Sequence, residues 1–264
     1  PDIPPDLGNP GWFLYDLDLT TVFARFLHVG RDALSRQAFL DPRWSRDTLA
    51  ERRLPGAELD APAGARPRLN FIWHTSYCCS TVIAAALDAP GRNLALKEPQ
   101  ALVGLANLKR GQQGALKRPG LARAVFSLYG RRFTPDEQVL IKPSNYANNL
   151  LAEAGEMTDG RHLMLYSSCR RFLVSVLKRR EDLRAYPREL FVALANDGHP
   201  QAAWPMKTLL CLTDLQMAAL AWHMQAAEMR KAMASLGDRA VSLDGDRFLA
   251  APREFVELGI GVLL

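Results

Sequence analysis

The feature that most constrains the fold is an alternation, from residue 68 onward, of short apolar runs with stretches of helical periodicity. The apolar runs are Leu69–Trp73, Leu94–Leu96, Val139–Ile141, His162–Tyr166 and Ala240–Leu243. The expected helices are Thr81–Leu87, Ala101–Leu108, Leu116–Tyr129, Asn145–Ala154, Arg171–Arg180, Pro187–Leu194 and a long one from about Lys207 to Leu236. Short apolar strands separated by helices predict an α/β fold with a mostly parallel sheet flanked by helices.

The first 67 residues do not share this alternation. Residues 1–11 are rich in Pro and Gly, which predicts an irregular arm, and Pro55–Pro67 has the composition of a surface linker. Trp12–Leu27 mixes aromatic and aliphatic residues, and we expect a helix there and one or two more within Ser35–Arg53. The predicted organisation is an N-terminal helical extension, residues 1–67, packed on an α/β domain, residues 68–264.

The stretch Phe71–Leu87 combines an apolar run, a small polar loop and an Ala-rich helix. A strand that turns tightly into a helix directs free backbone N–H groups and the positive helix end at one point, which favours an anion such as phosphate. The nucleotide motif G-x-x-x-x-G-K-[ST] is absent, since this loop has neither Gly nor Lys. The hydroxyl groups of Ser76, Ser80 and Thr81 would contact an anion, or they would simply cap the helix.

The basic residues are unevenly spread, with a net charge of +5. Between Pro99 and Pro135 no acidic residue interrupts the basic ones, and a second cluster follows the fourth apolar run. The residues concerned are Lys109, Arg110, Lys117, Arg118, Arg123, Arg131 and Arg132, then Arg170, Arg171, Lys178, Arg179 and Arg180. Such clusters attract polyanions or phosphorylated small molecules, unless they are only solvated helix faces. We do not expect a nucleic-acid partner, because no interleaved aromatic pattern accompanies the charge.

We expect a soluble, cytoplasmic protein. No apolar run approaches the roughly 20 residues that a membrane-spanning helix needs, and the first residues lack the pattern of a signal peptide. Four cysteines in 264 residues do not indicate a disulfide framework. A homo-oligomer is compatible with the sequence, which does not define the oligomeric state.

Several segments, in order, resemble the sulfotransferase superfamily in its bacterial and Golgi-like branch. They are His74–Thr81, Leu96–Gln100, Ile141–Ser144, Leu165–Ser175 and Leu243–Pro252. The resemblance implies a sulfotransferase fold related to the P-loop NTPases. It also implies transfer of a sulfuryl group from 3′-phosphoadenosine 5′-phosphosulfate to a hydroxyl or amine of a small-molecule acceptor, with no metal required.

In this family a loop of the type R-S-G-[ST]-T binds the phosphosulfate group. The aligned residues are Tyr77, Cys78, Cys79, Ser80 and Thr81, so Tyr77 stands where the family has its cation and Cys79 where it has a glycine. A residue with a Cβ resists positive φ by about 1–2 kcal/mol, so the loop is either strained or bent differently.

The family's second signature holds the donor's 3′-phosphate with an Arg and a Ser. Ser175 fits the serine, but Ser167 occupies the arginine position, and the resemblance leaves Arg170 or Arg171 to reach that phosphate.

For the chemistry, the resemblance implies Glu98 as the base, and Lys97 and Lys142 are available cations alongside the arginines at 170 and 171. Glu98 would otherwise cap the helix that begins near Pro99. His74 is either a second base or a histidine packed under the loop.

Other interpretations remain open at this stage. A catalytically degenerate relative would bind a nucleotide or phosphate without turnover, as the missing loop cation suggests. A phosphotransferase would need a carboxylate pair for Mg²⁺, for which Asp244 and Asp246 are the candidates. Cys78 or Cys79 would be a thiol nucleophile, or a zinc ligand with His74, although the zinc spacing is absent. The Met-rich 207–236 helix would pack the core or line an acceptor pocket.

Overall fold

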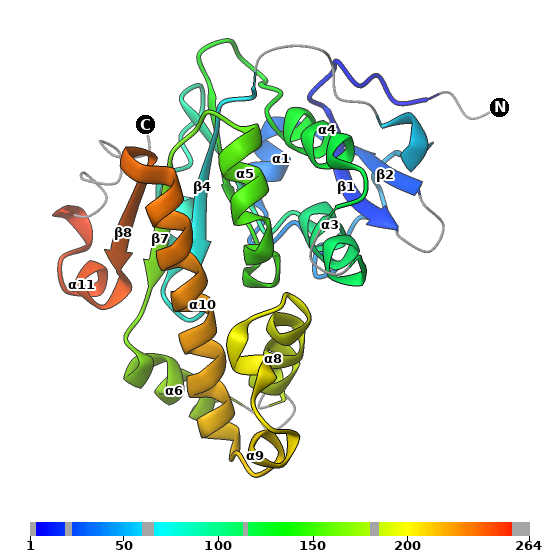
Figure 1. The fold of residues 1–264 in the computed structure, drawn as a ribbon. Helices are drawn as coiled ribbons and strands as arrows, with labels where there is room; N and C mark the ends of the chain where they lie inside the picture. The colour runs from blue at the N-terminus through cyan, green and yellow to red at the C-terminus, as the bar shows by residue number, and fades with distance from the viewer. Residues whose placement is uncertain (1–3, 19–22, 60–65, 113–115, 180–184, 255–264) are drawn as a thin grey trace.

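The computed structural model describes residues 4–18, 23–59, 66–112, 116–179 and 185–254. All five predicted strands form one parallel sheet in the order β5-β6-β4-β7-β8 (Figure 1). They are β4 (Leu69–His74), β5 (Asn93–Lys97), β6 (Gln138–Lys142), β7 (His162–Tyr166) and β8 (Ala240–Asp244). Helices flank this sheet, so the predicted fold class is confirmed.

The helices follow the predicted pattern with one interruption. They are α2 (Ser80–Ala86), α3 (Gln100–Gly111), α4 (Pro119–Tyr129), α5 (Leu151–Met157), α6 (Cys169–Leu177), α8 (Tyr186–Asn196), α9 (Met206–Leu210), α10 (Asp214–Leu236) and α11 (Gly245–Ala250), with the 3₁₀ segments η2 (Asn145–Leu150), η3 (Pro200–Ala203) and η4 (Gly237–Arg239). The single helix expected from Lys207 to Leu236 is two helices. Thr213 and Gln216 form a capping box that starts α10 afresh.

Side chains on the two faces of the sheet enter two different clusters. Along β4, Phe71 and Trp73 pack with α3, α4 and α5, whereas Ile72 faces the opposite side and packs with α2. The alternation follows from the two-residue period of a strand. Because both faces of the central strands are covered, each of these strands has a mostly apolar run, and this run made the strand recognisable in the sequence.

The expectation of a helix over Trp12–Leu27 is wrong for residues 12–18 and 23–27, and residues 19–22 lie outside the described ranges. β1 (Trp12–Asp18), β2 (Phe23–His28) and β3 (Glu51–Pro55) form an antiparallel sheet. The aromatic side chains of β1 suit a pleated, buried surface better than a helix. Within Ser35–Arg53, helix is confined to the end of α1 (Arg31–Arg36), and the linker prediction at Pro55–Pro67 falls on β3's last residue, η1 (Gly56–Glu58) and residues outside the described ranges.

The antiparallel sheet packs directly on α3 and shares one apolar core with the parallel sheet. At Gly104 in α3, a Cβ would lie 2.8 Å from the carbonyl oxygen of Leu17, so only glycine permits this approach. The Tyr129 hydroxyl donates to the carbonyl of Leu14 at 2.9 Å. Arg131 donates to the carbonyls of Leu7, Asn9 and Trp12, so this basic residue is structural.

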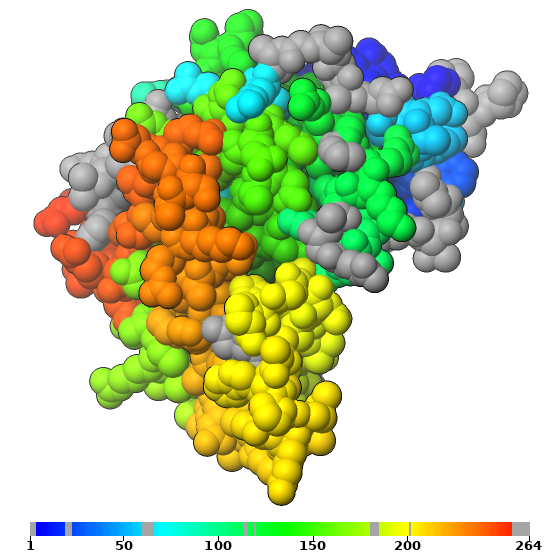
Figure 2. Space-filling view, viewed as in Figure 1, coloured from blue at the N-terminus to red at the C-terminus, as the bar shows by residue number. Residues whose placement is uncertain are grey.

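The carboxyl end of β4 has the position in the sheet where a ligand site is expected. The chain leaves β4 for β5 and β6 on one side of it, and later adds β7 and β8 on the other. Ligands in open parallel sheets bind where the strand order reverses in this way. A lobe made by α8, η3 and α9 (yellow in Figures 1 and 2) projects beyond this end of the sheet.

A buried histidine in the sheet gives a test of the packing. His162 accepts a hydrogen bond from the Trp73 indole N–H at 3.1 Å, and its pKa is lowered to about 3, first by burial and then by Arg239. Between about pH 6.5 and 3, His162 therefore binds a proton in the unfolded chain but not in the folded protein. We expect this residue to reduce the free energy of unfolding by about 1.4 kcal/mol for each pH unit below 6.5.

Urea unfolding of wild type and His162→Gln at several pH values measures this contribution. Below pH 6.5, the free energy of unfolding should fall less steeply with decreasing pH in the variant than in wild type. The difference in slope should be about 1.4 kcal/mol per pH unit, which corresponds to one proton. Equal slopes would show that His162 takes up its proton in the folded state.

Candidate functional site

The loop between β4 and α2 has an unusual backbone. Ser76, Tyr77 and Cys79 all have positive φ, at 70°, 52° and 65°. These are left-handed conformations that cost a residue with a Cβ about 1–2 kcal/mol. Of the two alternatives expected for Cys79, the structure has the strained left-handed backbone and not a different bend. Such strain persists only where the surroundings impose it.

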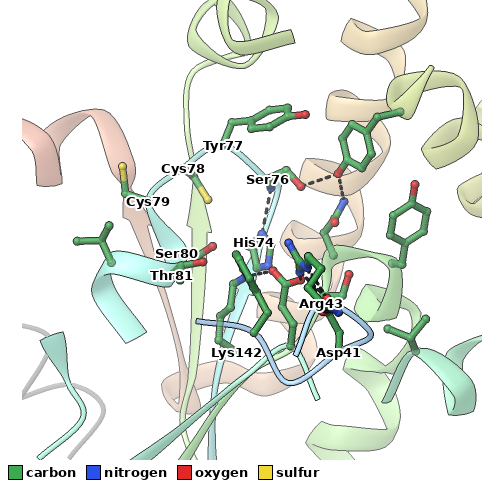
Figure 3. Close-up of a pocket in the computed structure, with 18 of the residues that line it drawn as sticks. Asp41, Arg43, His74, Ser76, Tyr77, Cys78, Cys79, Ser80, Thr81 and Lys142 are labelled. Atoms are coloured by element: carbon green, nitrogen blue, oxygen red, sulfur yellow. Dashed lines mark hydrogen bonds and ion pairs between the residues drawn. The ribbon is translucent and has the colours of Figure 1, made fainter. Parts of the chain in front are cut away.

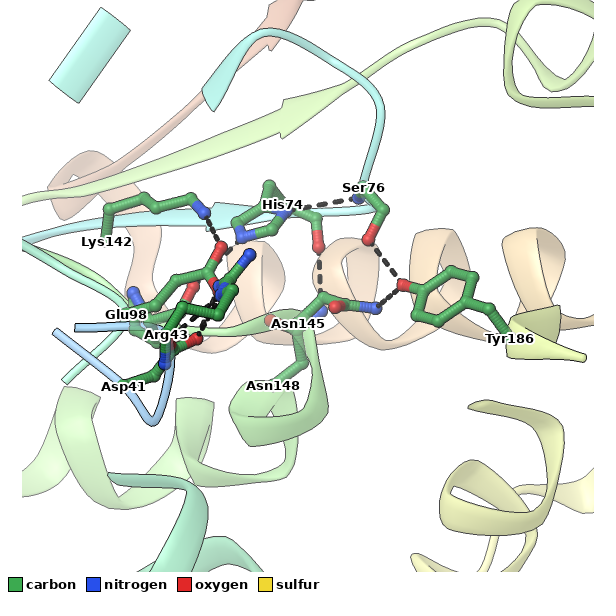
Figure 4. A network of polar contacts seen from close by, with 10 residues as sticks. Asp41, Arg43, His74, Ser76, Glu98, Lys142, Asn145, Asn148 and Tyr186 are labelled. Carbon is green, nitrogen blue, oxygen red and sulfur yellow. Dashed lines mark hydrogen bonds and ion pairs between the residues drawn. The ribbon is translucent and has the colours of Figure 1, made fainter. Parts of the chain in front are cut away.

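A buried polar network imposes this conformation (Figure 4). The Ser76 hydroxyl lies 2.7 Å from the Tyr186 hydroxyl, which accepts a hydrogen bond from Asn145 at 2.8 Å. Asn145 also donates to Gln225 at 3.0 Å, and Gln225 donates in turn to the carbonyl of Thr75. Elements α8, η2 and α10 therefore hold the loop through side chains.

His74 belongs to the same network. Its Nδ1 accepts from the Ser76 backbone N–H at 3.1 Å, and its Nε2 lies 2.9 Å from the carbonyl of Pro143. Asn148 donates to the carbonyl of His74. Burial, then Lys142, lower the pKa of His74 well below its usual value, so the imidazole is neutral. With both ring nitrogens engaged, His74 supports the loop, which is the packed alternative considered for it.

Glu98 follows β5 and is the chain's fourth non-glycine residue with positive φ, at 55°, among those described. Its carboxylate contacts Lys142 Nζ through one oxygen and Arg43 through the other, the latter at 2.7 Å. Lys142 ends β6, and burial lowers the pKa of its ammonium group while Glu98 raises it. The strained backbone thus presents a carboxylate beside a buried cation at the carboxyl ends of adjacent strands.

These groups line one cavity of about 670 Å³ (Figure 3). The loop residues lie on one side of it, and Lys142, Arg43 and Asp41 lie on the opposite side. Its lining includes His74, Ser76, Tyr77, Cys78, Cys79, Ser80, Thr81, Glu98 and Lys142 of the predicted set. We call it the loop cavity.

A second cavity of about 530 Å³ lies beside the first, and Tyr77 and Cys79 line both. It contains the predicted Arg170, Arg171 and Ser175, together with Lys178. Arg171 pairs with Asp246 at 2.7 Å, and Asp246 also accepts from the Ser168 hydroxyl at 2.7 Å. We call it the α6 cavity.

Two predicted site residues point elsewhere. Lys97 donates to the carbonyl of Ser35 at 2.7 Å and lies near Asp88, so it supports α1 and lines neither cavity. Neighbouring positions on a strand face opposite sides, which separates Lys97 from Glu98. Ser167 is fully buried and also lines neither cavity; its carbonyl accepts from the Trp222 indole.

The cysteines of the loop are not activated nucleophiles. Burial raises the pKa of Cys78 to about 12, and the Cys78 thiol contacts the carbonyl of Leu165. Burial also raises the pKa of Cys79. A thiol needs a lowered pKa to act as a nucleophile near neutral pH. In the described ranges no group of three or more His, Cys, Asp or Glu side chains is arranged to hold a metal ion.

Sequence reasoning missed the contribution of the N-terminal unit. Phe39, Asp41 and Arg43 line the loop cavity, and Arg43 pairs with both Asp41 and Glu98. It also missed Tyr186, whose partner Ser76 lies 110 positions away in the chain. No local pattern marks such residues, because only the packing of distant elements brings them to the loop.

The Met-rich α10 packs the interior, as the more conservative interpretation held. Met217 and Met224 contact α8 in one apolar cluster, and Met229 belongs to the main core. Within the described ranges no helix is both long and apolar enough to cross a membrane.

Comparison with known proteins gives a limited result. No family model and no curated protein matches this chain. Among solved structures, a sulfotransferase from Alicyclobacillus acidocaldarius matches at 11% identity and a TM-score of 0.40, covering 75% of this chain and 81% of that one. At this identity and TM-score the match identifies neither a family nor an activity for this chain.

The network around the loop can be tested at Tyr186. In Tyr186→Phe the loop loses its hydroxyl contact, and buried polar groups lose a partner, so we expect a loss of about 1–3 kcal/mol in the free energy of unfolding. Hydrogen exchange of the loop amides should also quicken.

Tyr146→Phe is the matched control, since the Tyr146 ring packs edge-on against Tyr186 at 6.0 Å and its hydroxyl has no hydrogen bond among the described residues. Equal stability and exchange in the two variants would contradict a role of the network in holding the loop.

Proposed function

We propose that this protein transfers a sulfuryl group from 3′-phosphoadenosine 5′-phosphosulfate to a hydroxyl or amine of a small molecule. The observation that carries the proposal is the pair of cavities that meet at Tyr77 and Cys79. One contains a carboxylate beside a buried ammonium group, and the other contains three exposed basic residues. A donor with anionic groups at both ends of a nucleoside fits this arrangement.

The residues present fit such a donor in most respects. Ser80 and Thr81 offer hydroxyl groups to the loop cavity, and Cys79 provides no side-chain cap to the first turn of α2. Arg170 and Lys178, which have no acidic partner among the described residues, offer cations to the α6 cavity for a second phosphate. Arg171 is partly neutralised by Asp246.

In the mechanism, Glu98 accepts the proton of the acceptor hydroxyl or amine. The acceptor atom forms its bond to sulfur as the sulfur–oxygen bond to the donor breaks, and the leaving group is adenosine 3′,5′-bisphosphate. Although Lys142 and Arg43 contact the two carboxylate oxygens, each oxygen has further lone pairs for a proton. Lys142, buried and preoriented, would stabilise the charge that develops on the bridging oxygen.

The positive φ of Glu98 agrees with this role. Its backbone N–H donates to the carbonyl of Lys142 at 2.7 Å, which extends the β5–β6 pairing by one residue and fixes the carboxylate beside the ammonium group. Backbone strain of this kind concentrates at functional sites.

The two other candidate functions have less support. The carboxylate pair that a phosphotransferase would use for Mg²⁺ is engaged, since Asp244 caps α11 and Asp246 binds Arg171 and Ser168. A degenerate, binding-only relative is favoured by one observation, the absence of a cation in the loop itself. It would bind the same nucleotide without turnover.

Calorimetric titration with adenosine 3′,5′-bisphosphate, against ATP with Mg²⁺, tests the donor. We expect the bisphosphate to bind and ATP with Mg²⁺ not to. Transfer of labelled sulfate from the donor to a panel of phenols, sugars and amines then tests turnover. Glu98→Gln should lower it about a hundredfold or more, as for loss of a general base, while binding of the bisphosphate persists.

Glu156→Gln, an exposed carboxylate away from both cavities, is the control. Binding of the bisphosphate without transfer to any acceptor would favour the degenerate relative. Binding of ATP with Mg²⁺ alone would reject the proposal.

A further inference from the structure

The cations of the loop cavity differ in how far they are already engaged. The basic residues that line it are Arg43, Lys142 and Arg179. Arg43 pairs with Asp41 and Glu98, and Lys142 pairs with Glu98. In the part of the chain that the structure describes, no carboxylate lies within ion-pair distance of Arg179. Among those residues, no carboxylate compensates the charge of its guanidinium group.

Lys142 can stabilise charge that develops during transfer while it stays beside Glu98, but it cannot leave Glu98 to bind the anion without cost. It is almost fully buried, and its contact with Glu98 compensates both charges. A ligand that drew Lys142 away would leave Glu98 with one partner fewer in a partly buried position, which is unfavourable. Arg179 is exposed and can bind an anion without breaking an ion pair.

The side chain of Arg179 lies over the ring of Tyr77. The guanidinium carbon is 4.9 Å from the centroid of the Tyr77 ring. Phe172 and Tyr186 contact the same ring at 5.5 and 5.8 Å, which fixes its orientation. Since α6 ends at Leu177, Arg179 lies beyond the helix. The aromatic face, worth about 0.5–1 kcal/mol to an exposed cation, therefore helps to hold it at the rim of the cavity.

We propose that Arg179, positioned by the ring of Tyr77, is the anion-binding cation of the loop cavity. Its planar guanidinium group can donate two parallel hydrogen bonds to a phosphoryl or sulfuryl oxygen pair. The hydroxyls of Ser80 and Thr81 line the same cavity as hydrogen-bond donors. The loop thus has an aromatic residue in place of a cation of its own and obtains its positive charge from the segment after α6.

That the ligand has two linked tetrahedral anions, as in a phosphosulfate, rests on the proposed function, whereas the role of Arg179 rests on its place in the cavity and its contact with Tyr77. Inorganic pyrophosphate is therefore the probe, since it contains the linked anions without the nucleoside.

The experiment is calorimetric titration of the full chain with pyrophosphate. Arg179→Gln should weaken binding about tenfold to a hundredfold, the range for loss of a charge-assisted hydrogen bond. Arg179→Lys, which keeps the charge but not the two-pronged geometry, should recover part of the loss. Arg230→Gln removes the same charge from an exposed position on α10 outside both cavities and should bind as wild type.

A second pair of variants tests the positioning by Tyr77. Tyr77→Phe keeps the aromatic face and should bind pyrophosphate as wild type. Tyr77→Leu removes the face and should weaken binding about twofold to fivefold, in proportion to the cation–π energy. Thermal unfolding of each variant shows that the fold is kept.

The outcomes separate this inference from the proposed function. If the bisphosphate binds and Arg179→Gln binds pyrophosphate as wild type, the role of Arg179 is rejected and the proposed function stands. If pyrophosphate binding depends on Arg179 but the bisphosphate does not bind, the anion-binding role of Arg179 stands and the proposed nucleotide donor is rejected. The inference also fails if pyrophosphate does not bind wild type, or if Arg170→Gln alone abolishes its binding.

Discussion

The site depends on one constraint, a loop whose backbone is left-handed at three residues that are not glycine. Each such residue costs about 1–2 kcal/mol, so the conformation exists only because a buried network holds it. Asn145, Tyr186 and Gln225 come from three separate elements and converge on Ser76 and Thr75. Since buried polar groups need partners, the network and the strained loop stabilise each other.

The same convergence explains why the chain needs the parts that lie outside the parallel sheet. The lobe contributes Tyr186 to the loop, and the N-terminal unit contributes Phe39, Asp41 and Arg43 to the wall of the cavity. The unit is held on α3 at Gly104 and by Arg131, which binds carbonyls of the N-terminal arm. The wall of the loop cavity is therefore assembled from three regions of the chain.

The sequence predicted the parallel sheet well because strands buried on both faces are mostly apolar, as in β4 and β7. It failed at residues 12–18 and 23–27, where an aromatic and aliphatic mixture fits a helix face as well as a strand. The loop, Glu98 and Lys142 were expected at the ends of predicted strands, and the structure brings them to one cavity, while their role in binding stays a prediction. The sequence could not distinguish Lys97 from Glu98, because which of two neighbours faces the cavity depends on the side of the sheet that α1 covers.

The sequence also could not show which basic side chains of the site are paired with carboxylates and which are not. From the sequence, Arg179 was one of a run of basic residues, and only its contact with Tyr77 singles it out. Ser167 occupied the expected position in the chain but is enclosed under α10. Positions within a motif predict which backbone approaches a ligand, whereas burial and pairing decide which side chains are free to bind it.

Hydrogen–deuterium exchange with and without adenosine 3′,5′-bisphosphate tests the central claim most directly. The account predicts slower exchange at two segments, residues 75–82 of the strained loop and residues 168–179 of the α6 cavity. The rest of the parallel sheet should be unchanged. Protection confined to other segments, or none at all at saturating nucleotide, would contradict the assignment of this loop as the anion site.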